Sequence, residues 1–205
     1  RDDVESRGLG DVYKRQGMRP QGNEQEARRN KHVRSAPSKI AVKALGEKVL
    51  DGILDKSSNP LLLILDCVQD PHNLGAILRT ADGAGVDAVI APRDKSVGIT
   101  ETVLRVSVGA AEKVPFIQVT NLARTMKQLQ SRGIWIFGTS DKGDRGLYET
   151  DFTGPAALVM GAEGEGMRRL TEENCDFLLR IPMKGSIPCL NVSVATGCLL
   201  YTSPS

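Results

Sequence analysis

The chain has 205 residues, of which 40% are hydrophobic and 25% are charged, a composition typical of a globular protein with one domain-sized core. No apolar run approaches the roughly 20 residues of a membrane-spanning helix, and the charged N-terminal stretch lacks a signal-peptide pattern. Composition therefore argues against a membrane protein or a secreted protein, and we expect a cytoplasmic location. The formal net charge of +2 is too small to indicate a partner by itself.

The distribution of charge is more informative than its sum. Between residues 19 and 48 the sequence has eight basic and three acidic residues, which gives this stretch a net charge of +5. Such a stretch can contact phosphates, although a solvated linker is the simpler interpretation. The four cysteines have no C-x-x-C spacing and only two histidines accompany them, so we expect reduced thiols and no metal site.

The domain boundaries follow from changes in composition and periodicity along the sequence. Residues 1–16 show no periodicity and residues 198–205 end a helical pattern abruptly, so both are interpreted as non-native tails. Residues 17–59 are polar, basic and interrupted by Pro and Gly, which predicts a linker or the remnant of an upstream domain, with a short helix over 49–54. Residues 60–197 are expected to form the folded domain.

From residue 61 onward, short apolar runs alternate with segments of helical spacing. Strands are predicted over 61–65, 87–91, 114–119, 134–138, 156–160 and 177–181. Helices are predicted over 73–85, over 101–110, around Leu122 to Leu129, and from near Leu190. Strands that alternate with helices predict an α/β fold with a largely parallel sheet, in which a continuous apolar run such as 61–65 is buried on both faces.

Ligands of open α/β sheets bind beyond the carboxyl ends of the strands, and three loops in such positions carry unusual residues. The first loop follows the strand at 61–65 and leads into a helix with Asn73, Gly75 and Arg79. The ordinary role of Asn73 is to cap this helix, and Gly75 allows another chain or a ligand to approach closely. A surface position is the simpler interpretation of Arg79.

The second loop follows the strand at 156–160 and contains Gly161, Glu163, Gly164, Glu165 and Gly166. Its glycine spacing differs from the G-x-G-x-x-G fingerprint of dinucleotide-binding proteins, and it comes late in the chain. The two carboxylates would repel a pyrophosphate but tolerate a cationic ligand. A glycine-rich turn with exposed acidic residues is the simpler interpretation.

The third loop spans residues 181–191 and leads into the last helix. Pro182, Gly185 and Pro188 predict an irregular backbone, and helix capping is the plain explanation of Asn191 and Ser193.

Together and in this order, the three loops resemble the motifs of the SpoU family of RNA 2′-O-methyltransferases, part of the SPOUT superfamily, over roughly residues 60 to 197. The matching motifs are Asn73-x-Gly75-x-x-x-Arg79, then Leu158-Val159-Met160-Gly161-x-Glu163-Gly164-x-Gly166, then Ile181-Pro182-Met183-x-Gly185 with Leu190-Asn191-Val192-Ser193. Segments 70–75, 119–126, 160–170 and 191–197 look especially like members that methylate a guanosine in the P-loop region of 23S rRNA.

The resemblance implies an α/β knot, in which the C-terminal segment forms a deep trefoil knot, and a homodimer that uses S-adenosylmethionine without a metal. The positions expected to bind the methyl donor are Met160, Gly161, Ile181, Met183, Leu190 and Ser193. The positions expected to be catalytic are Asn73, Arg79, Glu163 and Asn191. Because an arginine is always charged, we expect Arg79 to stabilise negative charge on the 2′-oxygen or a phosphate rather than to accept a proton.

The chain departs from the family pattern at three places. Cys189 stands where the family usually has serine, the match stops near Cys198 so that the knot's last helix is expected to be truncated, and a small N-terminal RNA-binding domain is lacking or present only as a remnant. The alternatives are a tRNA 2′-O-methyltransferase of the same family and a catalytically incomplete RNA-binding fragment. A dinucleotide-dependent oxidoreductase is disfavoured because the early glycine fingerprint and its later acidic residue are missing.

Overall fold

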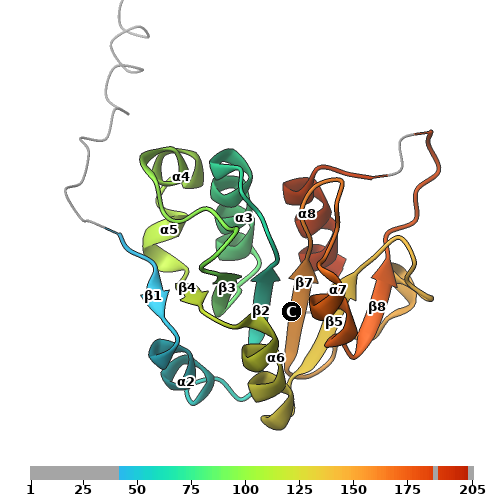
Figure 1. The fold of residues 1–205 in the computed structure, drawn as a ribbon, viewed down its shortest axis with the longest axis horizontal. Coiled ribbons are helices and arrows are strands. Elements are labelled where there is room, and N and C mark those ends of the chain that lie inside the picture. Colours follow the sequence, from blue (N-terminus) through green and yellow to red (C-terminus); the bar gives the residue numbers. More distant parts are fainter. Residues whose placement is uncertain (1–41, 187–188, 203–205) are drawn as a thin grey trace, which may run out of the picture. The chain divides into compact units, whose positions relative to one another are not determined.

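A parallel β-sheet forms the centre of the computed structural model, which describes residues 42–186 and 189–202 (Figure 1). The strands are β1 (Leu45–Gly46), β2 (Leu61–Leu65), β3 (Ala88–Pro92), β4 (Phe116–Val119), β5 (Trp135–Thr139), β6 (Arg145–Gly146), β7 (Ala156–Met160) and β8 (Phe177–Arg180). Their order across the sheet is β1-β4-β3-β2-β7-β5-β8-β6, and every pairing is parallel. The largely parallel sheet expected from the sequence is therefore parallel throughout its described strands. The expectations for residues 1–41 and 203–205 lie outside the described residues.

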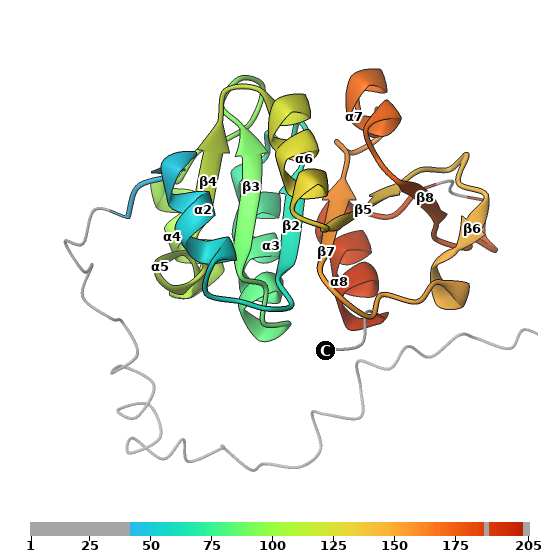
Figure 2. The ribbon, with the colours of Figure 1, turned by 90° about the horizontal axis from the view of Figure 1, so that it is seen from below.

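Helices cover both faces of the sheet. They are α2 (Lys48–Leu54), α3 (Pro71–Gly83), α4 (Glu101–Ser107), α5 (Ala110–Lys113), α6 (Leu122–Ser131), α7 (Arg169–Glu173) and α8 (Val192–Thr202), with a 3₁₀ turn η3 (Leu147–Glu149). Helices α3, α4, α5 and α8 lie on one face, and α2, α6 and α7 lie on the other (Figure 2). This sandwich of helices around a sheet is the expected α/β class.

The central strand β2 shows why its sequence is apolar without interruption. Leu63 and Leu65 face the core beneath α3 and α8, whereas Leu62 and Ile64 face the core beneath α2 and α6. All four side chains are buried, because successive residues of a strand point to opposite faces and both faces are covered here. The prediction of a strand buried on both sides is confirmed.

The six predicted strands are present, with ends shifted by at most two residues, and the structure adds the two-residue strands β1 and β6. The helix predicted over 101–110 is interrupted. Val108 and Gly109 both have positive φ, 52° and 91°, and this left-handed turn ends α4 and begins α5.

The start of α3 corrects the role expected for Asn73. Pro71 occupies the first turn, and Asp70 is the N-cap, since its carboxylate accepts a hydrogen bond of 2.9 Å from the backbone N–H of His72. Asn73 therefore lies inside the first turn with its side chain free for other partners. Gly75 packs against α4, because a Cβ there would lie 2.7 Å from the Cβ of Val106. The close neighbour of this glycine is a helix of the same chain.

The last helix extends beyond the boundary expected at residue 197. Helix α8 continues to Thr202, and Leu199 and Leu200 are buried in the same core as α3. Residues 198–202 are thus part of the packed domain. Among the helices of the described residues, none has the length and apolar character needed to cross a membrane.

Candidate active site

The three unusual loops meet at one edge of the sheet. Strands β2 and β7 are hydrogen-bonded neighbours whose last residues, Leu65 and Met160, are paired, and β8 ends two strands further along the same edge. Because all these strands run in parallel, the loops at 66–70, 161–168 and 181–191 leave the sheet on the same side. The chain thus gathers residues that are far apart in sequence.

The glycine-rich loop after β7 is a tight hairpin. Ala162 and Gly166 exchange two backbone hydrogen bonds of 2.9 Å, and Gly164 and Gly166 have φ of 80° and 72°, which favours glycine. A Cβ on Gly161 would lie 2.1 Å from the carbonyl carbon of Gly166. The glycines are therefore needed by the hairpin itself, which carries Glu163 near its tip.

Three of the four expected catalytic residues come together, and we name them the Asn–Glu–Asn cluster: Asn73, Glu163 and Asn191. The Asn191 side-chain N–H₂ donates to the side-chain oxygen of Asn73 at 3.0 Å, and both amide nitrogens lie 3.4 Å from Glu163 Oε2. Asn191 Oδ1 in turn accepts bonds from the backbone N–H and the hydroxyl of Ser193, so Asn191 caps α8 as expected. The cluster joins all three loops.

Arg79, the fourth expected catalytic residue, is exposed on α3 two turns after Asn73. Its guanidinium makes no hydrogen bond or ion pair with the part of the chain that the structure describes, and no contact links it to the Asn–Glu–Asn cluster. It is therefore a cation available to a phosphate or to another anionic group from outside the described chain.

The residues expected to hold the methyl donor surround the same loops. Met160 and Gly161 are buried at the end of β7, and Ile181 and Leu190 are half-buried against the core. Met183 is exposed in the loop after β8. These residues offer apolar side chains and backbone groups rather than charges, which suits the flat apolar surface of an adenine.

An ion pair between a buried carboxylate and an exposed arginine was not anticipated from the sequence. Asp66 follows β2 and is completely buried. Its carboxylate accepts hydrogen bonds of 2.8 Å from the Arg168 backbone N–H and Nε, and Arg168 Nη2 lies 2.6 Å from it as an ion pair. The side-chain hydrogen bond to Asp66 raises the pKa of Arg168, and burial raises the pKa of the neighbouring Cys67. A carboxylate directly after an apolar strand was the available signal.

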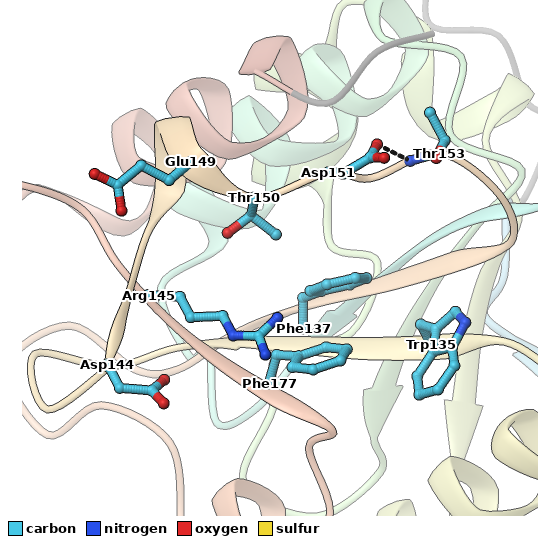
Figure 3. A pocket seen from close by; sticks show the side chains of 9 residues that line it. All are labelled: Trp135, Phe137, Asp144, Arg145, Glu149, Thr150, Asp151, Thr153 and Phe177. Atoms are coloured by element: carbon cyan, nitrogen blue, oxygen red, sulfur yellow. Dashed lines mark hydrogen bonds between the residues drawn. The ribbon is translucent and has the colours of Figure 1, made fainter.

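A separate pocket of about 550 Å³ lies at the β5–β8 side of the sheet and contains none of the expected site residues (Figure 3). It is lined by Trp135, Phe137, Asp144, Arg145, Glu149, Thr150, Asp151, Thr153 and Phe177. The Arg145 guanidinium lies 4.2 Å from the centre of the Phe177 ring, so this arginine already covers part of the aromatic wall. Within the described residues, no group of three or more His, Cys, Asp or Glu side chains could hold a metal ion.

Comparisons with known proteins agree with the motif positions. The SpoU rRNA Methylase family matches residues 60–201. The chain is 63% identical over 155 residues to the 23S rRNA (guanosine-2′-O-)-methyltransferase RlmB of Ralstonia nicotianae, covering 76% of this chain and 61% of that protein. It is 60% identical over 157 residues to the enzyme of the same name from Pseudomonas aeruginosa, covering 76% and 63%. The chain thus spans about three-fifths of these relatives' lengths.

Solved structures show the same fold. The SpoU methyltransferase AviRb from Streptomyces viridochromogenes, crystallised in complex with the cofactor AdoMet, matches with a TM-score of 0.67 and 28% identity, covering 73% of this chain and 62% of that one. The family match covers more than half of the chain and includes all three loops that build the Asn–Glu–Asn cluster. This chain therefore belongs to the SpoU rRNA Methylase family.

Proposed function

We propose that this chain transfers a methyl group from S-adenosylmethionine to the ribose 2′-hydroxyl of a guanosine in the P-loop region of 23S rRNA. The observation that carries the proposal is the Asn–Glu–Asn cluster, in which polar residues from three separate loops meet at the carboxyl edge of the sheet. The guanosine and the 23S rRNA substrate are supported by relatives about 60% identical that carry this activity in their names.

The chemistry of the loops fits the donor. Met160, Ile181 and Leu190 provide apolar walls at the ends of β7 and β8, and AviRb, of the same family, is solved with AdoMet. Glu163 would compensate a nearby positive charge. S-adenosylmethionine, when bound, supplies an electrophilic methyl group on a sulfonium.

The polar residues have distinct roles in this proposal. A ribose hydroxyl is a poor nucleophile, so its oxygen must be oriented and its developing negative charge stabilised. Arg79 supplies a cation that makes no hydrogen bond or ion pair within the described chain, and it would hold this oxygen or the adjacent phosphate. Asn73 and Glu163 would orient the ribose. The reaction then depends on positioning and requires no metal.

The knot is part of the proposal. Strand β8 lies between β5 and β6, although β5 and β6 follow one another along the chain. The connection between them crosses the end of β8, since Ser140 N–H donates to Leu179 O at 2.9 Å and a Cβ on Gly143 would lie 2.7 Å from the Leu179 carbonyl carbon. Helix α8 then returns to pack on α3 and β7. These crossings support threading of the C-terminal segment through the loop after β5.

We also propose a homodimer that uses the outer face of α8. Val194 and Tyr201 lie seven residues apart on this helix, which places them on the same side, and they are 54% and 70% exposed. A helix that is apolar on all sides is usually buried on all sides, and α8 has no charged residue between Val192 and Thr202. A second copy of the chain is the occupant that fits this face.

The test uses the whole 205-residue chain with unmodified transcripts of 23S rRNA, of 16S rRNA and of total tRNA, and with radiolabelled S-adenosylmethionine. The labelled ribose is located by primer extension, because a 2′-O-methyl group stops reverse transcription at low nucleotide concentration. We expect a single methylated guanosine in 23S rRNA, and a strongly reduced but measurable yield with Glu163→Gln. Transfer to tRNA alone would replace the proposed substrate, and donor binding without transfer to any RNA would indicate a catalytically incomplete fragment.

A further inference from the structure

Asp66 lies outside the Asn–Glu–Asn cluster, yet it is a charged side chain with no exposed surface. Burying a carboxylate is costly unless it is paired and hydrogen-bonded. Two hydrogen bonds and an ion-pair contact with Arg168 satisfy this requirement, and they bridge 102 residues of sequence. Such a pair holds together the two segments that contain Asp66 and Arg168.

The two segments are the ones that build the cluster. Asp66 begins the connection that leads to Asn73, and its backbone N–H donates to the carbonyl of Met160 at 2.8 Å. Arg168 ends the glycine-rich loop that carries Glu163. The pair therefore joins the first loop to the second, on the core side of the cluster.

The glycine-rich loop has few other attachments. Among the described residues, two side chains of 161–168 form hydrogen bonds with distant segments. Glu163 accepts from the two asparagines, and Arg168 donates to Asp66 through its side chain and also through its backbone N–H. Gly164 and Gly166 adopt positive φ angles of 80° and 72° and are exposed. Without the Asp66–Arg168 pair, the loop would keep the bonds of 3.4 Å at Glu163 and the packing of Met167 against the core.

We propose that Asp66 is a positioning residue for methyl transfer, which fixes the glycine-rich loop through Arg168 so that Glu163 stays in reach of Asn73 and Asn191. The expected effect on methyl transfer rests on the proposed function. The expected effect on the loop rests on the contacts alone. Arg168 binds the carboxylate through both its side chain and its backbone N–H. This arrangement fixes the direction of the chain at Arg168 as well as its distance from Asp66.

The first test is independent of activity. Asp66→Asn keeps the side-chain volume and removes the charge, and hydrogen exchange of the whole chain is followed by mass spectrometry. We expect amides of 161–167 to exchange about 10-fold faster or more, while those of β2 and β7 stay protected. Arg169→Ala is the matched control, since this neighbouring arginine is exposed and pairs only with Glu173 at 3.4 Å. Unchanged exchange in the loop of Asp66→Asn overturns the inference.

The second test measures methyl transfer. Asp66→Asn should lower kcat about 10-fold or more and leave the KM values for RNA and donor within about two-fold, because positioning acts on the transition state. In a Glu163→Gln background, Asp66→Asn should lower kcat by less than about two-fold, because its effect passes through Glu163. Equal losses in both backgrounds overturn the inference. If the wild-type chain transfers no methyl group, but the loop of Asp66→Asn exchanges faster, the proposed function is rejected. The structural role of the Asp66–Arg168 pair then still stands.

Discussion

The side-chain amide of Asn191 donates a hydrogen bond of 3.0 Å to the side-chain oxygen of Asn73, although 118 residues separate the two asparagines. The same Asn191 caps α8 through its oxygen, so one side chain both starts a helix and completes the Asn–Glu–Asn cluster. The fold of the C-terminal helix and the geometry of the cluster are therefore coupled.

This coupling can be separated from simple helix capping. Asn191→Ala should lower stability by about 1 kcal/mol through loss of the cap, and lower methyl transfer on the order of 10²-fold through loss of orientation in the cluster. Asn121→Ala is the matched control, because Asn121 caps α6 in the same way, accepting from Arg124 N–H at 3.0 Å, away from the cluster. Urea unfolding and transfer kinetics measure both effects. Equal transfer rates in the two variants would argue against a role for Asn191 in the reaction.

Gly161→Ala tests the hairpin after β7. Because its Cβ would lie 2.1 Å from the Gly166 carbonyl carbon, the loop must shift, at a cost of about 1–3 kcal/mol of stability and with loss of donor binding. Gly52→Ala is the control. This glycine lies in α2 with no atom within 4 Å of the new Cβ, so alanine should stabilise the chain by about 0.5–1 kcal/mol. Thermal unfolding and calorimetric titration with S-adenosylmethionine distinguish the two.

Arg79→Ala should lower methyl transfer on the order of 10²–10³-fold and leave donor affinity unchanged, because the free guanidinium acts on the ribose side. Arg79→Lys keeps the charge but not the planar fork, so we expect an intermediate rate. Single-turnover kinetics and donor titration are the measurements. Parallel loss of transfer and donor binding would show that Arg79 belongs to the donor site instead.

The proposed dimer interface on the outer face of α8 can be tested by introducing a charged side chain there. Val194→Asp places a carboxylate on the exposed apolar side of the helix, so the proposed dimer should dissociate while the monomer stays folded. Sedimentation velocity gives the oligomeric state and circular dichroism gives the fold. Lys113→Asp changes the charge of an exposed residue on α5 and should leave the oligomeric state as it is. A monomeric wild-type chain would remove the dimer from the proposal.

Burial raises the pKa of Cys175 to about 12, with smaller contributions from Asp176 and Glu172. The folded-state pKa lies above the unfolded value, so the thiolate forms more readily in the unfolded chain. Stability is then unaffected below about pH 9 and falls as the pH rises from there toward 12. Unfolding in urea from pH 8 to pH 10 should show this loss, and Cys175→Ala should reduce it. Cys189→Ala, which removes an exposed thiol, should have no such effect.

The sequence predicts local structure well because local structure has local causes. The run Leu61–Leu65 is apolar at every position, and the structure buries it on both faces. Asn191 precedes the last helix and caps it. The strand Arg145–Gly146, by contrast, has two residues and no period to detect, and Asn73 yields the cap of its helix to Asp70, three residues earlier.

The contacts within the site follow from the order of the strands, which no short segment contains. Asp66 meets Arg168 because β7 lies beside β2, with four strands between them along the chain. The convergence of Asn73 and Glu163 has the same origin. Motif resemblance identified the three loops, whereas the contacts of the folded chain show that an ion pair with a buried carboxylate joins two of them and that Arg79 stands apart.

That strand order has a consequence for synthesis on the ribosome. Leu65 pairs with Met160, so one edge of the central strand β2 stays without its partner until 95 further residues have been translated. At about 5–20 residues per second, the delay is roughly 5–19 s. An open, apolar strand edge invites pairing with other chains during that time. The unpaired edge of β2 is therefore the place where a nascent chain is most open to wrong strand pairing until β7 emerges.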